Sequence, residues 1–398
     1  MDHAPGVSLH EKWNSMTGVQ QIGCIDAIIQ KLKEMAEIEF PAYGSLYCAD
    51  TSLKLGSQIP LGQNFDIGPH CGAMYWDCNV AGPRFYHNVK PNRGPCKPSI
   101  CRIDVDSSIT YLLLGSDLAA YANGLIDTGI SRVPPDSEHR YGPRYQGSPS
   151  EHLRLLNIGR SVIEKMSSDL RIQNAATPTL FHPDLHKRNI FVSDDDPTVV
   201  TAIIDWQSAS VEPAFWYTEE APDFARLIPH PSLPDQYDHD SELCAKAFSL
   251  AVQYYLPKLF IARSLDENLF RPFRYCYRTW KDGAVVFRHE LIELSKDWEN
   301  LGFSGQCPFH TPGPEDLRIH AQEYRTLVAA HELKDTLSGL LNSAPDGWVP
   351  AAEWEPTLSA HKQFFELMLQ KVLEIEDADD DDPLRTEEDV RDLWPFDL

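Results

Sequence analysis

The chain has 398 residues, of which 42% are hydrophobic and 10% aromatic, so it can bury a sizeable core and is not a disordered protein. Its 35 Lys and Arg against 59 Asp and Glu give a formal net charge of −24, and such an acidic surface repels the phosphate backbone of nucleic acids. No run of about eighteen apolar residues is present, so we expect no membrane span.

The N-terminal half is predicted to contain three helices. Residues 17–38 repeat apolar side chains at helical spacing. Residues 45–103 are rich in Gly, Pro, Cys and aromatic residues, which indicates short strands and long loops. A second helix is expected over residues 112–125. A third is expected over residues 148–171, where the opening Ser-Pro-Ser-Glu sequence suits a capping box.

Short β segments follow, and then helices. Residues 177–181, 190–192 and 199–204 read as strands, and the polar stretch 193–197 reads as a hairpin turn. A long helix, then a loop and hairpin, then further helices indicate an α+β class. The expected later helices cover residues 242–260, 285–301, 314–341 and 351–375. The acidic block 374–382 indicates a solvated, mobile tail.

The cysteines and the N-terminus indicate little about function. The nine cysteines are an odd and scattered set, which favours reduced thiols over a disulfide framework. Cys71 with Cys78 and Cys96 with Cys101 lack the spacing of zinc ligands, so we expect thiols of the core or of loops there. Residues 1–7 carry neither the basic region nor the apolar run of a targeting peptide.

Three residues in the β region form a pattern that phosphoryl transfer needs. Asp184 and Asn189 lie in a loop between two short β segments, and Asp205 follows the second strand of the hairpin. Phosphoryl transfer depends on positioning and on charge neutralisation. We expect Asp184 to accept the proton of an attacking hydroxyl. Asn189 and Asp205 offer the hard oxygen ligands that Mg²⁺ prefers.

Neighbouring residues are predicted to shape this loop. His182 is grouped with Asp184 in the catalytic loop, and we expect it to hydrogen-bond the backbone and to hold the loop in shape. His186 either faces the site or packs beneath it. Trp206 and Gln207 are expected to pack against the hairpin and to order the loop.

Two other classes of function stay open. Alternate residues of an extended segment point to one side, so His182, Asp184 and His186 could bind one metal in a hydrolase. Asn189 and Asp205 would then have no evident task. The second class is a non-catalytic pseudokinase or binding module that uses the helical face and the acidic tail.

The motifs resemble a known family. His-x-Asp-Leu-His-x-x-Asn, followed by Ile-Ile-Asp-Trp, resembles the aminoglycoside phosphotransferase and choline kinase-like enzymes, which share the protein kinase fold. Several segments are similar to the fungal group named for altered inheritance of mitochondria protein 9. These segments are residues 1–7, 40–47, 92–95, 181–186 and 204–209.

The resemblance implies a protein kinase-like C-terminal lobe, mainly helical, with a small catalytic β-hairpin. It also implies ATP and Mg²⁺ as cofactors, the hydroxyl of a small molecule as phosphate acceptor, and a mitochondrial location, with the cytoplasm as the alternative. Pro183 stands where Gly is more common in the antibiotic kinases, which argues against an antibiotic as acceptor. The acidic composition favours a cationic acceptor, bound between the catalytic loop and the C-terminal helices. Nothing in the sequence bears on the oligomeric state.

Residues 1–7 resemble the linker between the two lobes of such enzymes, and Asp2 and His3 are assigned to nucleotide binding on that basis. No glycine-rich phosphate-binding motif is found, and Lys12, Lys31 and Lys33 fall in helical rather than strand pattern. We therefore expect the N-terminal lobe to be missing. The remaining chain is divided into the lobe, residues 8–375 with its catalytic core at 177–210, and the tail, residues 376–398. Without the N-terminal lobe, phosphotransfer by this chain alone is not expected.

Overall fold

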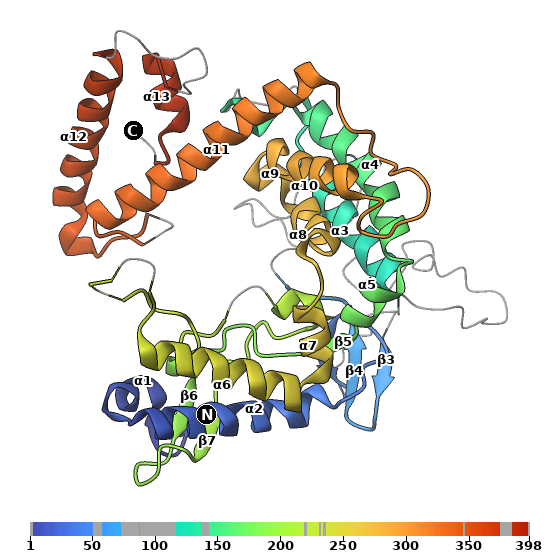
Figure 1. Cartoon of the computed structure of the whole chain (residues 1–398), viewed down its shortest axis with the longest axis vertical. Helices are drawn as coiled ribbons and strands as arrows, with labels where there is room; N and C mark the ends of the chain where they lie inside the picture. The colour runs from blue at the N-terminus through green and yellow to red at the C-terminus, as the bar shows by residue number, and fades with distance from the viewer. Residues whose placement is uncertain are drawn as a thin grey trace. The chain divides into compact units, whose positions relative to one another are not determined.

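The computed structural model has the expected α+β architecture, with many helices and small antiparallel sheets. Its residues fall into two compact units (Figure 1). Unit 1 comprises Met1–Ser131 and Arg160–Arg274, and unit 2 comprises Arg132–Gly159 and Tyr275–Leu398. The structure describes residues 3–50, 58–72, 87, 117–136, 143–218, 221–230, 232–233, 236–344, 347–374 and 384–396. Within these ranges, no helix is both long and apolar enough to cross a membrane.

Two long helices pack side by side in unit 1 (Figure 1). Helix α2 (Gly18–Ala36) begins with a capping box, in which the Thr17 hydroxyl accepts from the Gln20 backbone N–H at 3.3 Å and the Gln20 side chain accepts from the Thr17 N–H at 2.9 Å. Its buried stripe packs with α6 (His239–Tyr255) in one apolar core. The residues of that stripe are Cys24, Ile25, Ile28, Ile29 and Leu32. The helix predicted over residues 17–38 is confirmed.

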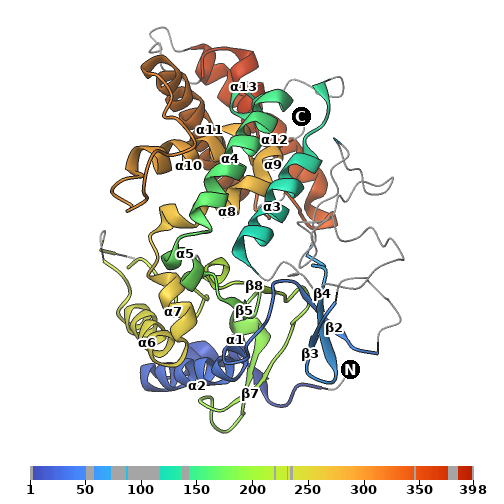
Figure 2. The same cartoon turned by 90° about the vertical axis from the view of Figure 1, so that its right-hand side faces the viewer.

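Among the described residues of unit 1, the strands form three small antiparallel sheets. The first sheet contains the predicted hairpin, in which Ile190 pairs with Ile203 and Phe191 with Ala202. The second lies within the region where short strands were expected, and Figure 2 shows its strands side by side. The strands are β1 (Val7–Ser8), β6 (Ile190–Val192) and β7 (Val200–Ile203) in the first sheet, β2 (Ser45–Cys48), β4 (Phe65–Gly68) and β3 (Ile59–Leu61) in the second, and β5 (Pro178–Leu180) and β8 (Val211–Pro213) in the third.

The remaining helices of unit 1 agree with the sequence pattern in part. The predicted helix 242–260 is split, because Pro257 has no backbone N–H to continue α6. A helix was also predicted over residues 112–125. Residues 112–116 lie outside the described ranges, and the observed helix runs from Leu118 to Arg132. The helices are α1 (Leu9–Lys12), α3 (Leu118–Arg132), α5 (Leu170–Ala175) and α7 (Pro257–Arg263).

The start of α4 (Pro149–Met166) confirms one half of the predicted capping box and contradicts the other. The Ser148 hydroxyl accepts from the Glu151 backbone N–H at 3.2 Å, as expected. The Glu151 carboxylate instead accepts from Arg288 at 2.5 Å. A charged partner is a stronger donor than a backbone amide, which accounts for this outcome.

Unit 2 contains helices close to those predicted over residues 285–301, 314–341 and 351–375. They are α9 (Thr279–Asp282), α10 (Ala284–Asp297), α11 (Pro314–Leu340), α12 (Trp354–Leu373) and α13 (Glu387–Leu393), and α8 (Arg271–Tyr275) reaches the boundary between the units. Pro314 begins α11 at the first helical position, where its missing N–H has no cost.

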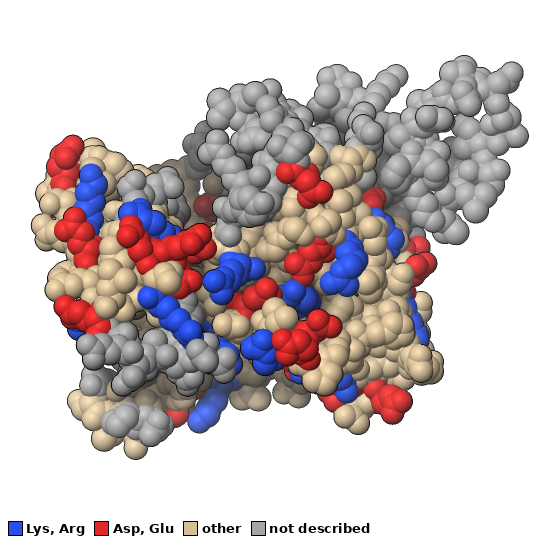
Figure 3. All heavy atoms as spheres, turned by 90° about the horizontal axis from the view of Figure 1, so that it is seen from above, with Lys and Arg blue, Asp and Glu red and all other residues tan. Residues whose placement is uncertain are grey.

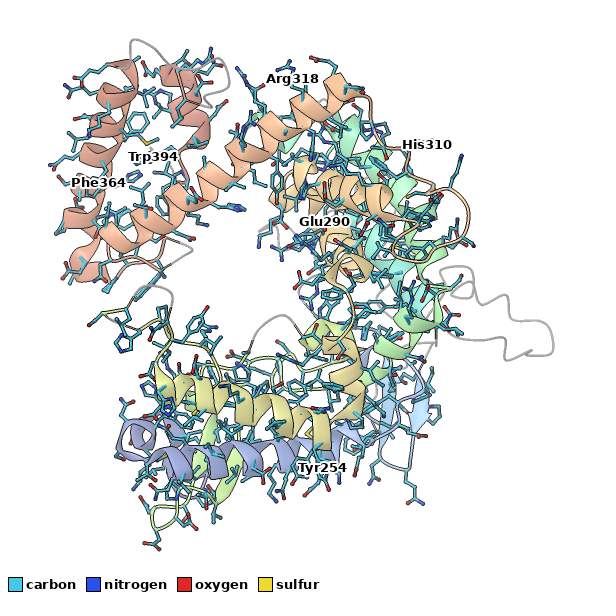
Figure 4. The ribbon with its side chains drawn as sticks, viewed as in Figure 1. Tyr254, Glu290, His310, Arg318, Phe364 and Trp394 are labelled. Atoms are coloured by element: carbon cyan, nitrogen blue, oxygen red, sulfur yellow. The ribbon has the colours of Figure 1, made fainter. Side chains whose placement is uncertain are left out.

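The C-terminal residues beyond the acidic block are folded. Thr386 and Asp389 form a capping box at the start of α13, and Val390 is fully buried. The Trp394 indole donates to His361 Nε2 at 2.6 Å, and Figure 4 shows Trp394 in the space between α12 and α13. Residues 384–396 are therefore folded, whereas residues 375–382 of the acidic block, for which a solvated tail was predicted, lie outside the described ranges. The division into linker, lobe and tail stays a prediction.

The N-terminal segment packs directly against the hairpin. Gly6 has φ +89°, and a Cβ atom there would lie 2.1 Å from the Val192 carbonyl oxygen. The Thr201 hydroxyl donates to the Pro5 carbonyl at 2.6 Å. The residues expected to form a linker are thus tied to both strands of the hairpin at Pro5 and Gly6.

We predict that Gly6→Ala destabilises the protein by about 2–4 kcal/mol, because the new methyl group meets backbone and the left-handed conformation disfavours a side chain. Gly62→Ala is the matched control. Gly62 has φ +70° with nothing within 4 Å of an added Cβ, so this variant should lose only about 1 kcal/mol. Urea unfolding of both variants measures the difference, and equal losses would contradict the close approach at Gly6.

One arginine links three helices of unit 2. Arg288 on α10 contacts Glu151 on α4, and on α11 it donates from Nε to His320 Nδ1 at 3.1 Å and from its terminal nitrogen to Glu323. His320 is buried, and burial, with the nearby charges of Arg288 and His289, lowers its pKa to about 4.

We predict that the stability of unit 2 falls as the pH drops from about 6.5 to about 4. In this window the unfolded chain binds a proton at residue 320 and the folded chain does not, so the loss reaches about 1–3 kcal/mol. Burial raises the pKa of Glu323, which offsets part of this loss. His320→Gln keeps an acceptor for Arg288 and should flatten the pH dependence of urea unfolding. An unchanged slope would contradict the assignment.

Candidate active site

The loop that is predicted to be catalytic, residues 181–189 and called the catalytic loop below, lies at one end of the hairpin. Strand β5 leads into residues 181–186, a short 3₁₀ turn at Lys187–Asn189 follows, and β6 begins at Ile190. The Ile204 backbone N–H donates to the Asn189 carbonyl at 2.9 Å, which extends the pairing of β6 and β7. The antiparallel hairpin therefore brings the Asp184 loop and Asp205 to the same end.

His182 links the Asp184 loop to Ile204, the residue immediately before Asp205. Its Nε2 donates to the Ile204 carbonyl at 2.8 Å, and its Nδ1 accepts from the Asp184 backbone N–H at 3.1 Å. The ring is buried, and its burial lowers its pKa from the ordinary value. One nitrogen donates and the other accepts, so the ring is neutral. These are hydrogen bonds to backbone, of the kind expected from the sequence for this residue.

The Asp184 carboxylate is exposed, and one of its oxygens lies near two nitrogen atoms. Asn189 Nδ2 donates to the Asp184 carbonyl at 2.9 Å and lies 3.4 Å from Asp184 Oδ2. His186 Nε2 lies 3.3 Å from the same Oδ2. His186 therefore faces the site, which answers the alternative left open by the sequence. Asp184 Oδ1 is left as the carboxylate oxygen that can meet a substrate.

Asp205 adopts an uncommon backbone conformation. Its φ is +65°, in the left-handed region, which Asp tolerates better than most residues because its short polar side chain can bond locally. The side chain of Asp205 is exposed. Trp206 follows, with its indole donating to the Ile203 carbonyl at 2.8 Å and its ring packed edge-on against His182. Trp206 thus packs beneath the loop, as predicted.

The donors present suit Mg²⁺ shared with phosphate groups. The amide nitrogen of Asn189 is used within the loop, which leaves its carbonyl oxygen for a cation, and Asp205 adds a carboxylate. Mg²⁺ is commonly held by one or two protein oxygens together with substrate phosphates. In the part of the chain that the structure describes, no group of three or more His, Cys, Asp or Glu residues is arranged to hold a metal. Both nitrogens of His182 are engaged, so the hydrolase alternative loses a ligand.

The two residues assigned to nucleotide binding are not brought into this arrangement. Asp2 lies outside the described residues. His3 is exposed, and its neighbours Pro5 and Gly6 contact the far end of the hairpin, at Thr201 and Val192. Their assignment stays a prediction, as do the roles of Asp184, His182, Asn189 and Asp205.

The sequence did not predict a buried network of hydrogen bonds around Glu212. The Glu212 carboxylate on β8 accepts from Tyr121 at 2.8 Å, from Ser210 at 2.9 Å and from His70 Nε2. Glu212 is only 3% exposed, so these bonds satisfy polar oxygen atoms that water cannot reach. A Glu in the otherwise apolar strand Val211–Pro213 was the available signal. The network supports the strand that pairs with β5 and so holds the start of the catalytic loop.

A pocket of about 320 Å³ opens beside the catalytic loop. Asp184 and His186 line it on the loop side, Asp223 follows in the chain segment after β8, and Arg263 comes from α7. All of these residues belong to unit 1. The pocket therefore places a small-molecule space next to the carboxylate that is predicted to act as the base.

We predict that His182→Ala lowers the free energy of unfolding by about 2–3 kcal/mol, because two backbone groups lose their hydrogen-bond partner and the shortened side chain leaves a cavity. His230 offers a matched control. Its Nδ1 accepts from the Ser232 N–H at 3.2 Å in an exposed turn, so His230→Ala should cost only a few tenths of this amount. Thermal melts of both variants test the contrast. Equal shifts in the melting temperature would show that His182 does not link the Asp184 loop to Ile204.

Comparison with known proteins agrees with this geometry. Residues 126–216, which include the catalytic loop and the hairpin, match the model of the Phosphotransferase enzyme family. This match and the α+β architecture indicate a kinase-like fold and support a kinase-like phosphotransferase at the level of the family.

The chain is also similar to two curated proteins of Aspergillus fumigatus, from two strains, each called a subtelomeric hrmA-associated cluster protein. Each is 27% identical over 260 residues, which cover 60% of this chain and 49% of the relative. The chain thus spans about half the length of the curated relatives it matches. No solved structure matches.

Proposed function

We propose that this chain carries the catalytic lobe of a phosphotransferase that moves the γ-phosphoryl group of ATP to a hydroxyl of a small molecule. The observation that carries the proposal is the arrangement at the end of the hairpin. There, His182 bridges the Asp184 loop to Ile204, immediately before Asp205. Phosphoryl transfer depends chiefly on holding such groups in place.

Each residue then has a task. Asp184 Oδ1 accepts the proton of the acceptor hydroxyl, while Oδ2 is held near His186 and Asn189. The acceptor oxygen forms a bond to the γ-phosphorus, the bond from that phosphorus to the bridging oxygen breaks, and its electron pair leaves with ADP. The proton passes from Asp184 to solvent. Asn189 and Asp205 would hold Mg²⁺, which neutralises charge on the phosphates when it is bound.

Two further aspects of the proposal rest on resemblance alone. A mitochondrial location and a kinship with the altered inheritance of mitochondria group follow only from the short sequence segments described above. A non-catalytic binding role with a mitochondrial task is the alternative.

The test is a transfer assay with γ-labelled ATP, Mg²⁺ and a panel of small hydroxyl compounds, using the protein expressed from its full transcript. Asp184→Asn removes the base while keeping the shape of the side chain, so we expect transfer to fall about 10²–10⁴-fold. Asp195→Asn is the control, since Asp195 lies exposed in the hairpin turn.

Retention of full transfer by Asp184→Asn would refute the proposed base. Absence of transfer to every compound, together with absence of Mg²⁺-dependent ATP binding in a thermal-shift measurement, would favour the non-catalytic alternative. Binding of ATP without transfer would point to an acceptor outside the panel.

A further inference from the structure

The pocket beside the catalytic loop has a distinctive charge distribution. Among the described residues, Asp184 and Asp223 are the acidic residues that line it. The Asp223 carboxylate accepts from the Lys187 backbone N–H at 2.9 Å, and its other oxygen lies 3.6 Å from the Lys187 ammonium nitrogen. Asp184 is the predicted base. Of the described residues that line the pocket, both carboxylates are therefore engaged, one with groups of the loop itself and one with a lysine.

Two arginines, Arg226 and Arg263, line the same pocket. The guanidinium of Arg263 lies over the Phe248 ring, 5.5 Å from the ring centroid, and no carboxylate partner is found for it among the described residues. Its position in the last turn of α7 is favourable for a cation, yet a helix end carries only a partial charge. In the described part of the chain, no carboxylate therefore balances the charge of Arg263, whose side chain is exposed.

This lack of a partner is informative in a chain with 59 acidic and 35 basic residues. Figure 3 shows Lys and Arg side chains lying beside Asp and Glu over much of the face it displays. Arg263 differs from these cations, because its neighbours in the pocket, Phe248 and Leu259, are apolar and buried. Desolvation by these surroundings lowers the pKa of Arg263, although a guanidinium remains charged.

We propose that the phosphate acceptor carries an anionic group, a carboxylate or a phosphate, which pairs with Arg263 while its hydroxyl meets Asp184. This inference rests on the proposed function and names the substrate class of the same site. A guanidinium matches the two oxygens of either anion with parallel hydrogen bonds. The volume of about 320 Å³ suits a small hydroxy acid or a phosphorylated alcohol. The cationic acceptor expected from composition is thereby replaced.

The test measures the binding of four small alcohols that differ in charge. Glycerate carries a carboxylate, glycerol 3-phosphate a phosphate, choline a cation, and glycerol no charge. Isothermal titration of the whole chain should show that one or both anionic probes bind and that the other two bind more weakly. The ratio of the dissociation constants of glycerate and glycerol 3-phosphate distinguishes a carboxylate site from a phosphate site.

Variants connect this preference to Arg263. Arg263→Gln should weaken the binding of the anionic probe about ten- to a hundredfold, the range expected for a lost charge-assisted hydrogen bond. Arg263→Lys should recover part of the affinity. Lys258→Gln is the control, since it removes a positive charge from the same helix outside the pocket. Unchanged melting temperatures would verify that the variants fold.

Each outcome bears on the inference separately from the proposed function. The inference falls if neither anionic probe binds, if choline binds more tightly, or if Arg263→Gln leaves the affinity unchanged. Transfer of phosphate to choline would support the phosphotransferase and overturn the anionic acceptor. Tight binding of glycerate through Arg263, without transfer from ATP to any alcohol, would support the pocket assignment and count against the phosphotransferase.

Discussion

A single neutral imidazole holds together the part of the molecule to which the proposed chemistry is assigned. His182 donates to the carbonyl of Ile204 and accepts from the amide of Asp184, two groups separated by about twenty residues of chain. Protonation of the ring would remove the acceptor and would place a charge in a buried site. The position of the predicted base relative to Asp205 therefore depends on the low proton affinity of this histidine. Trp206, packed edge-on against the ring, helps to keep water away from it.

The surrounding structure serves to keep this link in place. The hairpin is clamped from one side by the segment at Pro5 and Gly6, and β5 is fixed through β8, whose Glu212 is anchored by His70 and Tyr121. Rigid elements thus converge on a short loop, whereas the carboxylates of Asp184 and Asp205 stay exposed. A firm support for groups that substrates can still reach is what the proposed transfer reaction requires.

Local patterns were enough to predict the hairpin, most of the helices and the grouping of Asp184, Asn189 and Asp205, because turn residues, apolar periodicity and motif spacing are properties of neighbouring residues. The pairing of β5 with β8, the Glu212 network and the place of Arg263 in the pocket depend on contacts between distant segments, about which periodicity carries no information. The fold of residues 384–396 was missed for a related reason. An acidic block suggested solvation, but α13 beyond it buries Val390 and Trp394 against helices distant in sequence.

The left-handed backbone at Asp205 has a consequence for how such a protein can change over evolutionary time. Gly and Asn adopt that conformation at least as readily as Asp, so a mutation to either residue would remove the negative charge and leave the fold undisturbed. β-branched residues would strain the turn and be eliminated through misfolding. Under the proposed function, the substitutions that are easiest to tolerate here are therefore those that remove a proposed Mg²⁺ ligand. The proposed activity could then be lost at this position while the fold is kept.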